Sequence, residues 1–130
     1  PWPTLAELID RGTPVVVFTS DGGGEPSWYH AQWDWWMDNP YAAQDVADFS
    51  CAPDRGSVDN DLYNMNHFLT APIAMSELAA TANAYDALKA HATACTDAWG
   101  RPPNQVLVDF YDQGDTMRVV NELNGVSDGS

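Results

Sequence analysis

The sequence predicts an α/β fold with parallel strands, formed by residues 1–130 as a single unit. Two observations lead to this fold class. Segments with apolar residues at helical spacing alternate along the chain with short segments rich in Val, Leu and Phe, the order expected of βα units. The run at 15–18 is apolar without interruption, which indicates a strand covered on both faces, as in a parallel sheet.

The N-terminal residues predict a short helix followed directly by that strand. Thr4 and Glu7 have the spacing of a capping box at the start of a helix. Gly12 and Pro14 are a typical stop signal, and they end the helix after about two turns.

The middle of the chain predicts an extended segment and then a long irregular one. Polar and aromatic residues alternate over 28–36, which suits an extended segment with one wet face, and a helix remains the alternative. Residues 39–60 contain Pro40 and Pro53 and show little periodicity. A connection this long predicts an extended irregular loop that is functional or anchored by a disulfide.

The second half of the chain predicts two strands and two helices. The expected ranges are 62–69 for a strand, 76–99 for a helix, 105–112 for a strand and 115–125 for a helix. Ser76 and Asp115 are the predicted helix caps. The tail at 127–130 is expected to be loose.

The charge balance of the chain is strongly acidic. Nineteen acidic residues oppose five basic ones, so the formal net charge is -14. This charge repels phosphate backbones and anionic head groups, so we expect no nucleic-acid partner. No apolar run approaches the ~20 residues of a membrane-spanning helix. The acidic, Lys-poor and Trp-rich composition favours a secreted protein, and the first residue, Pro1, indicates that the natural start lies upstream.

The two cysteines, Cys51 and Cys95, permit one intramolecular pairing. A bond between them would stabilise the fold by roughly 4 kcal/mol on the chain-entropy model. We predict this disulfide because the composition is typical of extracellular proteins, where such bonds persist. Two small buried thiols are the alternative.

One acidic residue in the last predicted strand stands out as a site candidate. Side chains alternate along a strand, so Asp109 shares a face with Leu107 and Tyr111. A carboxylate among apolar neighbours near the carboxyl end of a parallel strand is either paired for structural reasons or used in a site. The sequence predicts Asp109 as a site residue, and the structural pair is the alternative.

The same alternation in the preceding predicted strand separates Asn64 and Asn66 from His67. If the polar face points inward, Asn66 lies in the site and His67 packs outward. A lone histidine among apolar neighbours is more often a core residue than a catalytic one, and we interpret His67 in that way.

Two further clusters invite a ligand. Trp33 and its neighbours Trp35 and Trp36 offer flat apolar faces beside the carboxylates of Asp34 and Asp38, as sugar-binding sites do, but of the two alternatives we favour core packing.

The second cluster consists of three aspartates that could bind calcium. Asp54, Asp59 and Asp61 have suitable oxygen ligands, although their spacing lacks the pattern of an EF-hand. We expect no cofactor, with calcium at these three residues as a weak alternative.

Five segments together carry a family resemblance. They are 28–34 (WYHAQWD), 39–41 (NPY), 49–56 (FSCAPDRG), 66–70 (NHFLT) and 103–112 (PNQVLVDFYD). The chain resembles, from about Trp2 to Gly125, the C-terminal half of the phosphatidylinositol-specific phospholipase C X-domain-like phosphodiesterases. These are secreted proteins with a TIM-type barrel, and segment 103–112 is the most specific part of the likeness.

The resemblance implies that this chain is the C-terminal half of a TIM (β/α)₈ barrel. A complete barrel takes ~250 residues, so 130 residues supply about half. Half a closed sheet leaves strand edges and one face uncovered. The chain is therefore expected to associate with the missing N-terminal half, with copies of itself, or with another partner.

The resemblance also implies a division of catalytic labour. The family's two catalytic histidines belong to the first barrel strands, which no segment here matches, so the chain alone is expected to be an inactive part of a phosphoric diester hydrolase. Its contribution would be a substrate face. Asp109 would orient a histidine or bind hydroxyls, Tyr111 would stack on a ring, and Arg55 would approach a phosphate. Asn66 and Asp34 complete the predicted substrate-binding set.

Two other functions remain open on sequence grounds. The barrel could serve as a non-enzymatic extracellular structural or adhesive subunit. It could also be a carbohydrate-binding or glycosidase-type half, with Asp34 and Asp109 as the candidate carboxylates.

Overall fold

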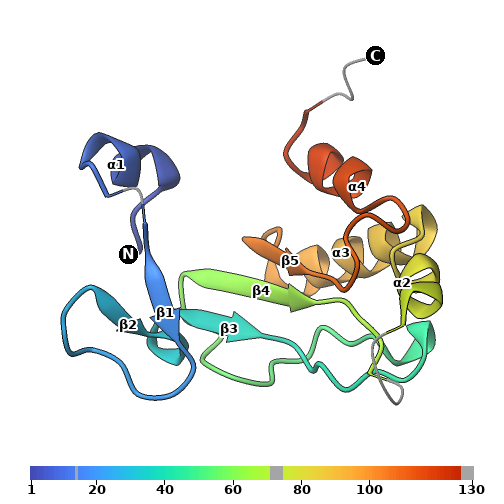
Figure 1. Cartoon of the computed structure of the whole chain (residues 1–130), viewed down its shortest axis with the longest axis horizontal. Helices are drawn as coiled ribbons and strands as arrows, with labels where there is room; N and C mark the ends of the chain where they lie inside the picture. The colour runs from blue at the N-terminus through green and yellow to red at the C-terminus, as the bar shows by residue number, and fades with distance from the viewer. Residues whose placement is uncertain (14, 71–74, 127–130) are drawn as a thin grey trace.

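The strands form two small parallel sheets, so the predicted α/β class with parallel pairing is confirmed (Figure 1). The computed structural model describes residues 1–13, 15–70 and 75–126. In the first sheet, β1 (Val17–Thr19) pairs with β2 (Tyr29–Ala31). In the second, the order is β3 (Trp36–Asp38), β4 (Leu62–Asn66) and β5 (Gln105–Leu107).

The N-terminal helix α1 (Leu5–Asp10) forms as predicted. Thr4 and Glu7 make the expected capping box, each side chain bonding the other residue's backbone N–H. The strand that follows differs from prediction, because Val15 is 70% exposed and β1 is only half-buried. The apolar run therefore does not mark a strand buried on both faces.

The segment at 28–36 is only partly extended. After β2 the chain turns through a short 3₁₀ helix, η1 (Gln32–Asp34), before β3 begins. This turn separates the two sheets, so β2 and β3 are distinct strands rather than one alternating segment.

Two helices cover one face of the three-stranded sheet. Figure 1 shows α3 (Tyr85–Trp99) and α4 (Thr116–Leu123) grouped beside β4 and β5, whereas α1 stands apart. The core between them is formed by buried apolar side chains of β4 and of both helices, namely Met65, Leu88, Ala92, Cys95 and Val119.

The predicted long helix at 76–99 is two helices. α2 (Ser76–Ala82) begins after Met75, so Ser76 is its first residue and not its cap. The break follows at Asn83, whose Nδ2 donates to the carbonyl of Asp109 at 2.9 Å and whose own carbonyl accepts from Asp115 N–H at 2.8 Å. Asn83 thereby ties the helix break to the turn after β5, which apolar periodicity could not reveal.

The last strand is shorter than predicted. β5 ends at Leu107, and Asp109 lies beyond it in a turn where Phe110 adopts a left-handed backbone with φ of 47°. The carboxylate of Asp115 precedes α4 but accepts from the backbone N–H of Tyr85, so its predicted capping bond is absent. The predicted loose tail at 127–130 lies outside the described residues.

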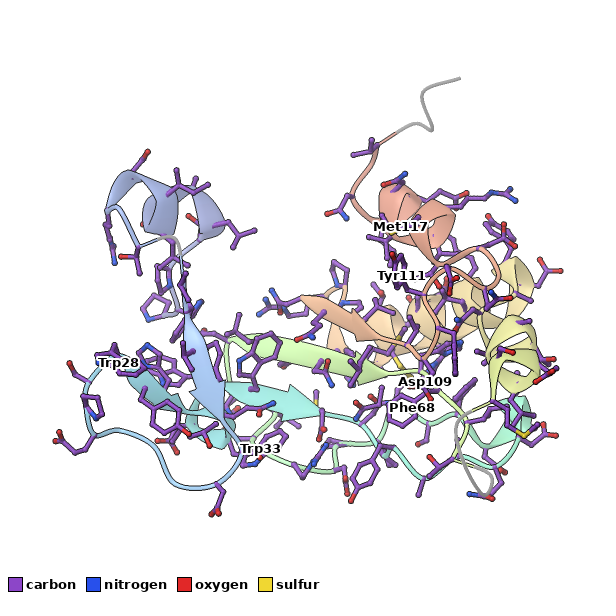
Figure 2. All side chains as sticks on the ribbon, in the orientation of Figure 1. Trp28, Trp33, Phe68, Asp109, Tyr111 and Met117 are labelled. Carbon is purple, nitrogen blue, oxygen red and sulfur yellow. A yellow bond between two sulfur atoms is a disulfide. The ribbon has the colours of Figure 1, made fainter. Side chains whose placement is uncertain are left out.

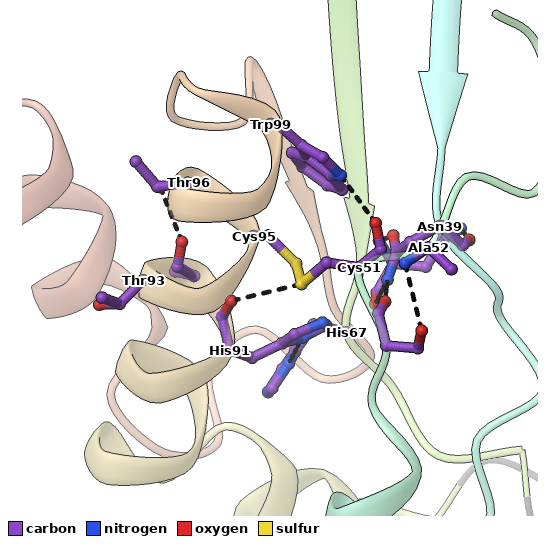
Figure 3. Close-up of a disulfide and its surroundings, with 12 residues drawn as sticks. Asn39, Cys51, Ala52, His67, His91, Thr93, Cys95, Thr96 and Trp99 are labelled. Atoms are coloured by element: carbon purple, nitrogen blue, oxygen red, sulfur yellow. Dashed lines mark hydrogen bonds between the residues drawn. A yellow bond between two sulfur atoms is a disulfide. The ribbon is translucent and has the colours of Figure 1, made fainter. Parts of the chain in front are cut away.

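The irregular connection between β3 and β4 is confirmed as long, and the disulfide anchors it. It contains one short 3₁₀ helix, η2 (Val46–Asp48). Cys51 in this segment is bonded to Cys95 on α3, with their Cα atoms 5.0 Å apart, so the alternative of two free thiols is wrong (Figure 3). Trp99 Nε1 also donates to the Cys51 carbonyl at 2.8 Å, which fastens the same loop a second time.

One glycine allows this connection to lie against β3. Gly56 has φ of 75° and forms a bridge with Met37. A Cβ atom at Gly56 would lie 1.8 Å from the carbonyl oxygen of Trp36, far inside van der Waals contact. The residue must therefore be glycine for the two backbones to approach.

The expected half of a TIM barrel is not evident in this architecture. The described residues form two separate sheets, four α-helices and no closed barrel. The observed fold is mixed α/β with small parallel sheets.

Reducing the Cys51–Cys95 bond should destabilise the chain strongly. The bond closes a loop with a sequence separation of 44, for which the chain-entropy model gives about 4 kcal/mol. We expect the double variant Cys51→Ala/Cys95→Ala to show this loss in the free energy of unfolding by urea. Adding reductant should lower the stability of the wild type and leave that of the double variant unchanged; equal responses would contradict the prediction.

Candidate functional site

A buried carboxylate lies at the carboxyl end of β3. The side chain of Asp38 is fully buried and accepts hydrogen bonds from Asn66 Nδ2 at 3.0 Å and from Arg55 Nε at 3.1 Å. It also accepts the backbone N–H of Arg55 at 3.0 Å and contacts Nη2 of the same guanidinium. A buried carboxylate is costly unless it is paired and hydrogen-bonded, and both conditions hold here.

Strand register brings these groups together. In the parallel pair, Asp38 is opposite Asn64, and Asn66 follows two residues later on the same face of β4. Met65 packs against the helices on the opposite face, and His67 lies there too. The polar face therefore turns away from the helices, as the sequence predicted for Asn66 and His67.

A second asparagine completes the network. Asn39 Oδ1 accepts the backbone N–H of Asn66 at 2.7 Å, while its Nδ2 donates to the carbonyls of Asn66 and Ser50. Asn66 Oδ1 in turn accepts from Asn64 Nδ2 at 2.9 Å. Each side-chain amide is thus held in one orientation, which fixes the donor that reaches Asp38.

Arg55 is the cation of the site. Its guanidinium carbon lies 4.5 Å from the ring centre of Trp33 and 4.6 Å from that of Tyr41, which suits cation–π contacts. The hydrogen bond to Asp38 raises the pKa of Arg55 further above its ordinary value. Because 41% of the Arg55 side chain is exposed, the guanidinium can also donate to an incoming anion.

The predicted site residues divide into two groups. Arg55 and Asn66 meet at Asp38, whereas Asp34 is exposed in η1. Asp109 is half-buried and Tyr111 is 69% exposed, and both lie beyond β5, where Figure 2 labels them. Among the described residues, no hydrogen bond joins the side chains of this second group to Asp38.

Asp38 is the residue that sequence reasoning underestimated. The sequence indicates it only as a carboxylate near the tryptophans, whereas in the structure it is the centre of the network. The available signal was the polar pair Asp38–Asn39 directly after Trp36–Met37, a strand end followed by polar side chains. A three-residue strand is too short for alternation to identify its inward face.

The three tryptophans do not form one flat platform. Trp33 stacks on Arg55, Trp35 packs against Trp2 with ring centres 4.9 Å apart, and Trp36 packs edge-on against Phe18. The core-packing alternative describes Trp35 and Trp36 better than the sugar-binding one.

The weak calcium alternative finds no cluster of ligands. Asp54 lies near Arg55, and Asp61 accepts the backbone N–H of Trp2. Within 1–13, 15–70 and 75–126, the only close group of three potential metal-ligating side chains is Cys51, His91 and Cys95. Both of its sulfur atoms belong to the disulfide.

Comparison with known proteins identifies the family. The PI-PLC X 1 family model matches residues 1–124. This chain belongs to the PI-PLC X family. The predicted resemblance is therefore confirmed, and the PI-PLC X match includes β3, β4 and β5 with the Asp38 network.

Several curated relatives share this PI-PLC X similarity at low identity. PI-PLC X domain-containing protein 1 of Arthroderma benhamiae is 28% identical, covering 96% of this chain and 45% of its own length. An uncharacterized secreted protein of the same fungus is 29% identical, with coverages of 97% and 34%. A PI-PLC X domain-containing protein of Arabidopsis thaliana is 28% identical, with coverages of 95% and 31%.

The chain thus spans less than half the length of these relatives. No solved structure is significantly similar. Among the described residues, no helix has the length and apolar character to cross a membrane.

Replacing Arg55 by methionine should destabilise the chain by about 2 kcal/mol, because it leaves the buried carboxylate of Asp38 without its cation. Arg118→Met is the matched control, since Arg118 is 51% exposed and pairs with Glu122 on the surface. The control should lose less than about 1 kcal/mol in urea unfolding. Adding Asp38→Asn to Arg55→Met should recover stability; further loss in the double variant would disprove the ion-pair explanation.

Proposed function

We propose that this chain forms the substrate face of a PI-PLC X phosphodiesterase and holds a phosphodiester while the acid and base are supplied from outside the chain. The observation that carries the proposal is the Asp38–Arg55 pair at the carboxyl ends of β3 and β4. Open and closed parallel sheets both place their ligands at that end of the strands.

Arg55 supplies the phosphate-binding part of the proposal. Its backbone is fixed to β3, because Asp38 N–H donates to the Arg55 carbonyl at 3.0 Å. Its side chain is fixed by Asp38 and by the two aromatic rings that flank it. A guanidinium held in this way needs little reorganisation to donate hydrogen bonds to phosphate oxygens, and this favours binding.

Asp109 and Tyr111 supply the polyol-binding part. Both follow β5, the strand next to β4, at the same end of the sheet as Asp38. A carboxylate accepts hydrogen bonds from ring hydroxyls, and an exposed aromatic ring packs on the apolar face of a cyclic polyol. Asn66 holds Asp38 in place. Asp34, exposed in η1, remains a further candidate for the site.

The catalytic histidines would come from a separate part of the barrel. A full barrel takes ~250 residues, and the relatives are more than twice as long as the matched segment. We propose that the chain is the C-terminal half, completed by an N-terminal half or by another copy, and is inactive alone. The unpaired edge of β5 is where a further strand would add.

A secreted location suits this proposal. The Cys51–Cys95 bond is of the kind that persists outside the cell, and one relative is named a secreted protein. No membrane-spanning helix occurs in the described part of the chain.

Ligand binding to the chain alone tests the proposed function. In NMR titrations, myo-inositol 1-phosphate should shift signals around Arg55 and Asp109, and Arg55→Met should weaken this binding at least tenfold. Asp109→Asn and Tyr111→Ala should weaken binding of the inositol phosphate but not of inorganic phosphate. Arg118→Met is the control and should bind both ligands normally.

Three results would overturn this function. Hydrolysis of a phosphodiester by the chain alone would show that the acid and base lie within it. Binding of oligosaccharides with quenching of Trp33 and Trp35 fluorescence would favour the carbohydrate-binding alternative. Stable self-association without affinity for any of these ligands would favour a structural subunit.

A further inference from the structure

Two buried histidine rings contact each other on the side of the sheet opposite Asp38. His67 follows β4 and His91 lies on α3, and their Nδ1 atoms are 2.8 Å apart. His67 is 0% exposed and His91 6%. Figure 3 shows His67 beside His91. Phe49 packs on both rings, with centres 4.2 Å from His67 and 4.8 Å from His91, so three parts of the chain meet at the pair.

The hydrogen bonds fix where the protons lie in the neutral pair. His67 Nε2 is 2.8 Å from the carbonyl of Ala82, which can only accept, so this nitrogen carries the hydrogen. The Nδ1 atom of His67 is then an acceptor, and His91 Nδ1–H donates to it. The remaining nitrogen, His91 Nε2, carries no hydrogen in this tautomer; it is buried and makes no well-formed hydrogen bond, although the Ser50 carbonyl lies close to the His91 ring.

An added proton would be poorly accommodated. Burial lowers the pKa of His67 to about 4, opposed by the Ala82 carbonyl and reinforced by His91. Burial also lowers the pKa of His91, opposed by the Ser50 carbonyl. An imidazolium here would lose its hydration. It would also lie against a second imidazole ring, which becomes positively charged when it is protonated in turn.

No carboxylate neutralises the pair in the described part of the chain. The groups packed on it are the Ala82 carbonyl from the end of α2, Phe49 and the Ser50 carbonyl, and the Cys51–Cys95 bond. The nearby charges are engaged elsewhere. Lys89 on α3 pairs with Glu122 at 3.1 Å, and Asp45 and Asp48 accept backbone N–H groups around η2.

The pair is connected to the Asp38 network through the backbone. Ser50, beside Phe49, accepts a hydrogen bond from Asn39 Nδ2 at 2.8 Å. Asn39 also bonds both backbone groups of Asn66, the residue that precedes His67. The segment 39–51 is therefore fastened at one side by the asparagines and at the other by the histidine pair and the disulfide.

We propose that the His67–His91 pair is an acid-operated latch, which holds segment 39–51 against α3 while neutral and loosens it when protonated. The pair joins β4 to α3 through a hydrogen bond that exists only while one Nδ1 atom lacks a proton. Double protonation converts that bond into a repulsive contact between two imidazolium rings. The Cys51–Cys95 bond retains the segment, so loosening is local and reversible.

The sign of the pH effect follows from the lowered pKa values. Between pH 6.5 and about 4, the unfolded chain binds more protons on these rings than the folded chain. The contribution of the neutral pair to the free energy of unfolding is therefore complete above pH 6.5 and is lost as the pH falls toward 4. Below the pKa of His67 in the folded chain, protonation of His67 causes no further loss.

A variant that keeps the hydrogen bonds but cannot titrate tests the latch. In His67→Gln/His91→Asn, the Gln amide can donate to Ala82 and the Asn amide replaces the Nδ1–H donor. Between pH 7 and 4.5, the folding equilibrium constant of the wild type should fall about 50-fold more than that of this variant. His30→Gln, outside the pair, is the matched control and should fall like the wild type. Parallel curves for all three proteins would overturn the proposal.

Two measurements on the wild type remain decisive even if the double variant does not fold. Carbon NMR of the His67 ring should show that it keeps its neutral shifts down to about pH 5, because burial lowers its pKa to about 4. Hydrogen exchange, corrected for its intrinsic pH dependence, should increase in 39–51 below that pH and not in 17–31. Titration of the His67 ring near pH 6.5, or uniform exchange, would contradict the latch. Neither readout depends on the proposed phosphodiester site.

Discussion

The constraint on which the candidate site depends is the buried charge of Asp38. A carboxylate without solvent needs a cation and hydrogen-bond donors in fixed positions, and the chain supplies them from two places. Arg55 comes from the long connection and Asn66 from β4, so neither strand pairing nor loop position can change independently. The geometry of the short sheet and that of the irregular connection therefore depend on each other.

One face of β4 packs against the helices, and the other forms the polar network of the candidate site. Met65 and His67 turn toward the helices, where apolar packing and the histidine pair hold α3. Asn64 and Asn66 turn the other way and build the polar network. A single strand with alternating side chains therefore links the stability of the helical layer to the geometry of the site.

Sequence reasoning was most successful where the signal is local. The capping box of α1, the pairing of the two cysteines and the alternation in β4 each depend on a few residues, and each was predicted. It was less successful where a distant partner decides the outcome. The helix break at Asn83 is stabilised by the turn after β5, and the length of β5 depends on that same turn.

The candidate site was predictable only in part for the same reason. Arg55 and Asn66 were identified, one by family resemblance and the other by strand alternation. Their common partner Asp38 was not, because a three-residue strand gives no usable periodicity. The half-barrel architecture depends on closure of a whole sheet, which these residues do not display by themselves.

The close approach at Gly56 has a consequence for substitution on this surface. The residue is solvent-exposed, so it looks like a harmless place for a label or a solubilising side chain. Yet it directly follows Arg55 and touches the backbone of β3. Even a methyl group there would push the segment that carries Arg55 away from β3 and leave the Asp38 carboxylate without its cation, so an exposed position controls the electrostatics of the buried network.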